Sequence, residues 1–154
     1  MTAPEPVGAA ESIVVPHDAA SVAVVRRSLD LTLKQVGVDD HDRGDALLVM
    51  SELVSNAVKH ATPLGGDGIG IRWAVDAEQL EIAVTDGGSH TDPVADIAAM
   101  TAVGGRGLDI VRKISKRWGV SESDGRVTVW ARLPVALPSR GRRDPEPGGL
   151  RPAH

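Results

Sequence analysis

The chain is 154 residues long, carries a formal net charge of −4 and contains no cysteine. The lack of cysteine excludes disulfides, thiolate nucleophiles and cysteine-ligated zinc, while the acidic balance and scarce aromatic residues argue against direct nucleic-acid binding. No run approaches the roughly 18 apolar residues of a membrane span, and the first residues do not resemble a signal peptide. We therefore expect a soluble, cytoplasmic protein whose core consists of Val, Leu, Ile and Ala.

The first predicted elements are one short strand and two helices. Residues 1–10 are rich in Ala, Pro and Gly and are expected to be disordered, and a strand follows near residues 12–15. Asp18 is placed to cap the first helix, which carries an apolar stripe and ends at Gly37. The second helix is expected over about residues 40–61, before a flexible stretch of Pro and Gly.

The second half of the chain predicts most of a sheet. Strands are expected at about residues 69–75, 79–85, 119–123 and 126–133, with a helix at about 107–117. Asp124-Gly125 is a strong hairpin signal between the last two strands. Helices on one face of a mixed, mostly antiparallel sheet make a two-layer α+β sandwich. We expect this domain to cover residues 11–135, followed by a disordered Pro-, Gly- and Arg-rich tail at 136–154.

The second helix carries a carboxylate and a carboxamide one turn apart. Glu52 and Asn56 project within roughly 40° of each other, whereas Leu53, Val54 and Ala57 can face a core. An Asn oxygen can help to coordinate Mg²⁺ beside phosphates and water, and a neighbouring Glu can accept a proton from an attacking hydroxyl. Taken alone, such a pair is more often part of a solvated helix face.

Two later segments add weight to this pair. The alternating strand at residues 80–85 ends in Asp86-Gly87-Gly88, so it delivers one carboxylate to a glycine turn. Residues 103–111 form a glycine-rich loop that runs into an amphipathic helix, an arrangement that lets backbone N–H groups approach phosphates. Each glycine cluster alone is more often an ordinary turn, so the order and spacing of the three segments are the signal.

A helix with E-x-x-x-N, a strand ending in D-x-G and a G-x-G loop before a helix resemble the Bergerat-fold (GHKL) ATPases, which include gyrase B, histidine kinases and MutL. The short length, the Glu four residues before the Asn and the ending at residues 126–131 resemble the anti-sigma-factor serine kinases of the RsbW and SpoIIAB type, especially the stand-alone actinobacterial regulators. The resemblance covers roughly residues 11–135. It implies the Bergerat ATP-binding fold, ATP and Mg²⁺ as ligands, and a serine/threonine protein kinase.

The resemblance also implies a role for each matching residue. Asn56 would ligate Mg²⁺, and Glu52 would be the base that acts on a substrate serine. Asp86 would accept a hydrogen bond from the adenine amino group, with Gly88 leaving room for the ring and Thr128 supporting the adenine end. The other cofactor-binding residues would be His60 at the helix end and the phosphate-facing loop residues Gly104, Gly105, Arg106, Gly107 and Leu108.

The implied partners are an anti-sigma-factor antagonist of the STAS type, which the kinase would phosphorylate, and a sigma factor, which it would sequester. Such a cycle regulates transcription by partner switching, and kinases of this type are often homodimers. No direct nucleic-acid or membrane contact is implied.

Two alternatives remain open. The family box usually reads D-x-G-x-G, but His90 replaces its last glycine, which motivates a non-catalytic module in which ATP changes the affinity for a partner protein. A sensor histidine kinase also matches residues 56–60. However, the preceding segment has room for only one long helix, and Glu52 stands where those kinases usually have Asn.

Overall fold

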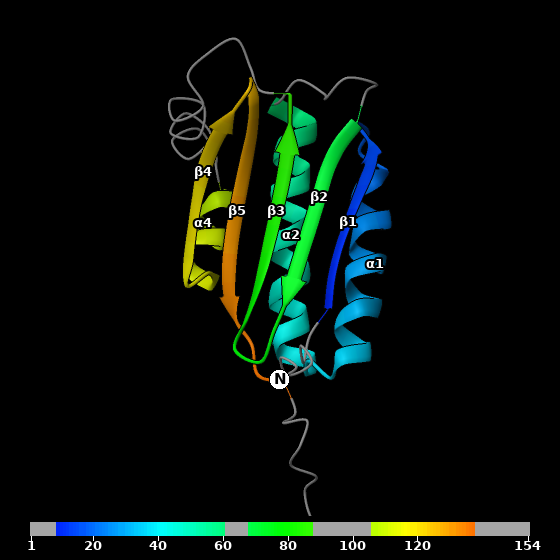
Figure 1. Ribbon diagram of the computed structural model, residues 1–154, viewed down its shortest axis with the longest axis vertical. Helices are drawn as coiled ribbons and strands as arrows, with labels where there is room; N and C mark the ends of the chain where they lie inside the picture. The colour runs from blue at the N-terminus through cyan, green and yellow to red at the C-terminus, as the bar shows by residue number, and fades with distance from the viewer. Residues whose placement is uncertain (1–8, 61–67, 88–105, 138–154) are drawn as a thin grey trace, which may run out of the picture.

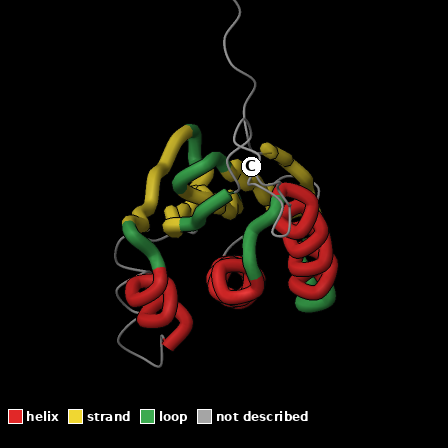
Figure 2. Tube along the Cα trace, turned by 90° about the horizontal axis from the view of Figure 1, so that it is seen from below, coloured by secondary structure: helices red, strands yellow, loops and turns green. Residues whose placement is uncertain are grey.

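The computed structural model describes residues 9–60, 68–87 and 106–137. Within these ranges a five-stranded sheet of order β1-β2-β3-β5-β4 carries three helices on one face (Figures 1 and 2). Every strand pair in this sheet is antiparallel. The predicted two-layer α+β sandwich is therefore confirmed, with an antiparallel sheet. None of the described helices is both long and apolar enough to cross a membrane.

The elements follow the predicted order, with a few shifted boundaries. They are β1 (Ala9–Pro16), α1 (Ser21–Val36), α2 (Asp40–His60), β2 (Gly68–Val75), β3 (Gln79–Asp86), α4 (Arg106–Ile114), β4 (Arg117–Ser123) and β5 (Arg126–Pro134). Strand β1 starts earlier than predicted because Ala9 already pairs with Val75 of β2. Helix α4 ends earlier than predicted because Arg117 already pairs with Arg132 in the sheet.

The two chain ends are mostly outside the described residues. The predictions of disorder for residues 1–8 and 138–154 therefore concern residues outside the described ranges. Ala9 and Ala10 do not fit the expected disordered start, because they pair with Val75 and Ala74 across β1 and β2.

Helix α1 begins slightly later than its sequence signal indicated. Its N-cap is Ala20, which has no side chain to cap the helix. Asp18 Oδ1 instead accepts a hydrogen bond from the Ala20 backbone N–H at 2.8 Å, which makes a turn just before the helix. The predicted end is confirmed, since Gly37 has a left-handed backbone (φ 92°) and its N–H donates to the Leu33 and Lys34 carbonyls.

Helices α1 and α2 are clamped at the lower end of the molecule by Arg43. Its Nε donates to Asp30 Oδ1 at 3.1 Å, and its Nη2 donates to Asp40 Oδ1 at 2.7 Å. Lys34 adds an ion pair to Asp30 at 3.2 Å. Burial by itself raises the pKa of the Asp30 carboxyl, but the hydrogen bonds and charges of Lys34 and Arg43 outweigh it. The pKa of Asp30 therefore lies below its ordinary value of 3.8.

The hydrophobic core lies between the sheet and the helices. Along β2, β3 and β5 the side chains alternate between the two faces, and most of the buried ones face the helices. The largest fully buried side chains in the described residues include Trp73, Leu29, Leu33, Met50, Ile69, Ile71, Leu80, Ile82 and Leu133. This packing fixes α2 against β3, which brings two of the predicted motifs into adjacent layers.

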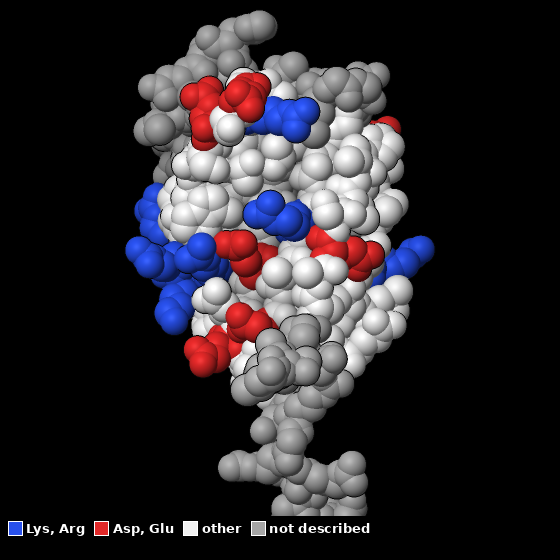
Figure 3. Space-filling model, in the orientation of Figure 1, with Lys and Arg blue, Asp and Glu red and all other residues white. Residues whose placement is uncertain are grey.

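The opposite face of the sheet, which we call the open face, points toward the viewer in Figures 1 and 3. Its charges are largely paired: Arg132 Nε donates to Glu81 at 2.9 Å, and Arg72 lies 3.9 Å from the same carboxylate. The Arg132 guanidinium also lies over the Trp130 ring, 4.9 Å from its centroid. Figure 3 shows a group of basic side chains at the β4 edge of the sheet, and Lys116 and Arg117, where β4 begins, are exposed.

Candidate functional site

Two of the elements that carry predicted site residues end on the same side of the molecule, which is uppermost in Figure 1 and is here called the upper end. Helix α2 and strand β3 both finish there (Figure 1). Strand β2 starts there as well, because Gly70 pairs with Thr85 near the end of β3. The C-terminal turns of α2 therefore lie over the C-terminal end of β3.

The helix motif has the predicted orientation. Leu53, Val54 and Ala57 are buried in the core, as expected for an apolar stripe. Glu52 and Asn56 are half-buried, so they lie at the border between the core and solvent. Both residues are therefore partly exposed on the helix whose apolar stripe is packed in the core.

Asp86 is the only buried acidic residue among those that the structure describes. It ends β3 and is 6% exposed, and it shares the helix-facing side of the strand with Ile82 and Val84. Transfer of a carboxylate from water into a protein interior costs free energy unless polar partners compensate. A buried Asp at this position is well suited to recognise a hydrogen-bond donor on a ligand.

Thr128 does not lie with Asp86. In the register of β3 and β5, Asp86 pairs with Val127, whereas Thr128 pairs with Thr85. The Thr85 and Thr128 hydroxyl oxygens are 2.7 Å apart, so these two residues share one hydrogen bond on the open face. The structure therefore does not bring Thr128 together with Asp86, and the residue beside Asp86 in the sheet is the buried Val127.

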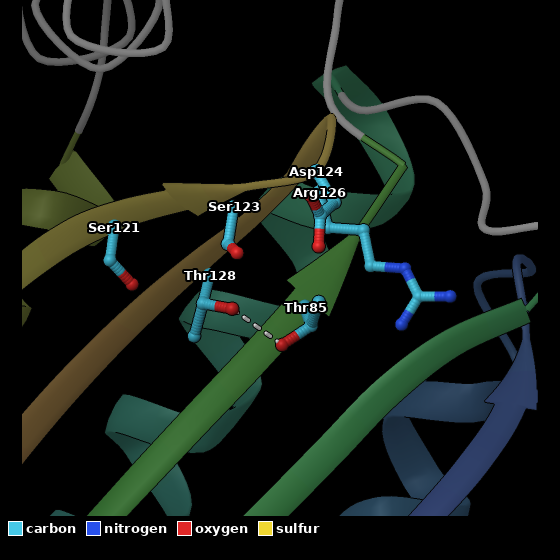
Figure 4. Close-up of a pocket in the computed structure, with 6 residues that line it drawn as sticks. All are labelled: Thr85, Ser121, Ser123, Asp124, Arg126 and Thr128. Atoms are coloured by element: carbon cyan, nitrogen blue, oxygen red, sulfur yellow. Dashed lines mark hydrogen bonds between the residues drawn. The ribbon is translucent and has the colours of Figure 1, made fainter.

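Thr128 instead helps to line a hollow on the open face. The hollow has a volume of about 460 Å³ and is lined by Thr85, Ser121, Ser123, Asp124, Arg126 and Thr128. Figure 4 shows the hydroxyl groups of β3, β5 and β4 along its floor and Arg126 extending from the hairpin between β4 and β5. The sheet separates this hollow from Asp86, so it is not part of the predicted nucleotide site.

The remaining predicted residues divide into two groups. Gly88, His90, Gly104 and Gly105 lie outside the described residues. His60 ends α2, while Arg106, Gly107 and Leu108 form the first turn of α4, and only their backbone is described. The predicted start of a helix at this point is therefore confirmed, and the contacts of these residues with a ligand remain a prediction.

The donor set at the upper end fits Mg²⁺ better than a tightly caged transition metal. No group of three or more His, Asp or Glu side chains within the described ranges is arranged to hold a metal ion. Mg²⁺ commonly keeps several waters and binds one or two protein oxygens together with substrate phosphates. The half-buried amide oxygen of Asn56 is an appropriate single protein ligand for such an ion.

The sequence analysis missed two contacts to α2. Arg26 of α1 donates through Nη1 to Ser51 Oγ at 2.6 Å, which places a cation one residue from Glu52. His17, in the connection between β1 and α1, donates through Nε2 to the Ala57 carbonyl at 3.1 Å. Neither contact has a local sequence signal, because the partners are 25 and 40 residues apart.

Comparisons with known proteins agree with this architecture. A family model for the histidine kinase-like ATPase domain matches residues 15–133. The structure of the RsbU and RsbW domains of Rv1364c from Mycobacterium tuberculosis is 21% identical with a TM-score of 0.64, covering 86% of this chain and 34% of that one. A second match is a chain in the structure of the SiaB–SiaC complex from Pseudomonas aeruginosa, which is 16% identical with a TM-score of 0.55. This match covers 80% of the present chain and 89% of that one. No curated protein sequence matches the chain.

These comparisons differ in what they support. The chain spans about a third of the length of the first solved structure, and at these identities both structures support the fold alone. The family model is more informative, because it covers most of the chain, including Glu52, Asn56 and Asp86. The chain belongs to the family of histidine kinase-like ATPase domains.

Proposed function

We propose that this chain is an ATP-binding regulator of the anti-sigma-factor serine/threonine kinase type. Family membership supports ATP as the ligand, and the fold shared with an RsbW domain supports the choice of group. The observation that carries the proposal is the packing of α2, which bears the half-buried Glu52 and Asn56, against β3, which ends in the buried Asp86.

Each of these side chains has a distinct task in the proposed site. The Asp86 carboxylate accepts a hydrogen bond from the adenine amino group, an interaction strengthened by burial. The Asn56 amide oxygen holds Mg²⁺, which when bound neutralises charge on the phosphates. The glycine loop that includes Gly104 and Gly105 and the first backbone N–H groups of α4 face the phosphates, with Arg106 as an added cation. His60, the last residue of α2, is a further proposed contact to the nucleotide.

Glu52 is the proposed base for phosphoryl transfer. Its carboxylate takes the proton of a serine hydroxyl on the antagonist as that oxygen attacks the γ-phosphorus, and ADP leaves with the electrons of the broken P–O bond. The half-buried position of Glu52 suits this task, because a partner protein can reach it from solvent. The substrate would be a STAS-type antagonist, and the sequestered partner would be a sigma factor in the cytoplasm. Homodimerisation belongs to the same proposal.

The catalytic claim is tested by transfer of labelled phosphate from ATP to a cognate antagonist. Glu52→Gln should slow transfer by at least about a hundredfold, the usual scale for loss of a general base, and should leave Mg-ATP affinity within about threefold. Glu78→Gln is the matched control, since Glu78 is exposed in the turn between β2 and β3. Equal transfer by wild type and Glu52→Gln would refute Glu52 as the base.

One observation favours a second candidate, a non-catalytic module in which ATP controls partner binding. The side chain paired with Asp86 is Val127, and the hydroxyl expected from Thr128 faces the other side of the sheet. In this case ATP orders the site and shifts the affinity for a partner protein without phosphate transfer. Partner binding that responds to ATP equally in wild type and Glu52→Gln, with no phosphate transferred by either protein, would support this candidate.

A further inference from the structure

His17 connects the first strand of the sheet to the helix that carries the proposed magnesium ligand. It lies in the short connection between β1 and α1, at the upper end of the molecule. Its Nε2–H donates to the carbonyl oxygen of Ala57 at 3.1 Å. A carbonyl can only accept, so the contact fixes the hydrogen on Nε2.

The connection that presents His17 is fixed on both sides. Before it, the Pro16 carbonyl accepts a hydrogen bond from Ser21 Oγ at 2.7 Å, and the Ser21 side chain is buried. After it, Asp18 Oδ1 accepts the Ala20 N–H at 2.8 Å. The first bond spans the connection and the second forms a turn directly after His17, so the His17 ring is presented to α2 from a preorganised segment.

The accepting carbonyl is one that the helix cannot satisfy by itself. Helix α2 ends at His60, and the last four carbonyls of a helix have no partner within it. Ala57 is 5% exposed, so its carbonyl lies close to the core, where a missing hydrogen bond costs free energy. Asn56 immediately precedes it. The turn that His17 secures is therefore the turn that presents the Asn56 amide.

We infer that His17 is a positioning residue for the magnesium-binding turn of α2. The inference rests on the proposed function, because it gives Asn56 a metal to hold. By donating to Ala57, His17 keeps the final turn of α2 helical and so holds the Asn56 oxygen where a nucleotide-bound Mg²⁺ needs it. Adenine recognition by Asp86 depends on β3 instead and does not require His17.

Calorimetry with and without Mg²⁺ tests whether His17 affects only the metal-dependent part of ATP binding. His17→Ala should weaken Mg-ATP binding by about three- to tenfold, the value of one hydrogen bond, while metal-free ATP binding in EDTA changes by less than about twofold. His17→Gln keeps an N–H donor at similar reach and should restore most of the loss. His41→Ala, at the exposed first turn of the same helix, is the matched control and should bind as wild type does.

Hydrogen exchange of the nucleotide-free protein gives an independent readout. In His17→Ala, amides at the end of α2 should exchange faster, whereas those near Ala46 and Val49 in the same helix should not change. If His17→Ala bound Mg-ATP with the affinity and metal dependence of the wild type, and its α2 amides exchanged at the wild-type rates, the inference alone would be overturned. A folded wild-type protein that binds no Mg-ATP would contradict the proposed function, and with it this inference.

Discussion

The two sides of the sheet at its upper end use polar side chains in opposite ways. On the helix side, a carboxylate is buried at Asp86, at the end of the strand that packs against α2 with its half-buried Glu52 and Asn56. On the open face, Thr85 and Thr128 form a hydrogen bond in a hollow that the Ser121 and Ser123 hydroxyls also line (Figure 4). Thr85 and Asp86 are consecutive residues, so the pleat of one strand separates the two environments.

This difference identifies which polar groups are informative. A carboxylate buried at the end of a strand reduces stability unless it gains polar partners, so its presence gives a functional lead. An exposed hydroxyl costs little and needs no such explanation. The helix side should therefore control nucleotide binding, whereas the open face should affect stability without affecting nucleotide affinity.

The largest effect among the following four substitutions is expected from Asn56→Ala. Loss of a ligand to a charged group should cost about 1.5–3 kcal/mol of Mg-ATP binding, or about tenfold to a hundredfold in affinity. Titration calorimetry with and without Mg²⁺ should show that the affinity for ATP falls only when Mg²⁺ is present. Ser55→Ala, the half-buried neighbour, is the control and should bind normally. If Asn56→Ala lost as much ATP affinity in EDTA, its effect would not come from the coordination of Mg²⁺.

Gly119→Ala tests the open face by overpacking it. A Cβ at Gly119 would lie 2.7 Å from Cζ2 of Trp130, so the indole ring must move. We expect a loss of about 1–2 kcal/mol in unfolding free energy, measured by urea unfolding, with unchanged Mg-ATP affinity. Gly44→Ala is the matched control, because nothing lies near its Cβ position in α2, and it should stabilise the protein by about 0.5–1 kcal/mol.

Thr85→Val isolates the hydrogen bond on the open face. The substitution keeps the shape of the side chain but leaves the half-buried Thr128 hydroxyl without the Thr85 oxygen. The expected cost is about 0.5–1.5 kcal/mol of unfolding free energy, measured by chemical denaturation. Mg-ATP affinity should not change. A nucleotide defect in this variant would mean that the open face influences Asp86 through the shared strand.

The smallest effect should come from Asp30, which is remote from both regions. Its pKa is lower in the folded state, so its ion pairs contribute stability above the ordinary Asp value of 3.8, and this contribution is lost as the pH falls below that value. Asp30→Asn should remove this acid-dependent part of the stability, measured as unfolding midpoints across the acid range. An unchanged pH profile would contradict the stabilising role of the clamp with Arg43.

Much of the fold follows from local patterns. The alternation at residues 79–86 predicts a strand, and the apolar spacing over α1 and α2 predicts two helices, as the structure has them. Gly37 ends α1, as its position in the sequence indicates. The same periodicity placed Leu53, Val54 and Ala57 in the core and Glu52 and Asn56 at its border. These features depend on residues within one or two turns of each other.

The remaining features depend on contacts between distant segments. Strand side chains alternate between the two faces of a sheet, so a change of one residue in the register moves a side chain to the other face. The family resemblance implies that Thr128 supports the adenine end, whereas the register with β3 puts Val127 on the face that carries Asp86. His17 could not be linked to Ala57, because only the tertiary packing of the sandwich brings them together. The pattern within one strand therefore does not fix its register with a distant strand, and a shift of one residue changes the face on which a side chain lies.

The central claim is that the helix side of the sheet, with Asp86, binds the nucleotide. The most direct test is calorimetry of Mg-ATP binding to wild type, Asp86→Asn and Thr128→Val, with circular dichroism to check folding. We predict that Asp86→Asn weakens binding by at least about tenfold and that Thr128→Val binds as wild type does. Equal binding by wild type and Asp86→Asn, or a loss confined to Thr128→Val, would contradict the account.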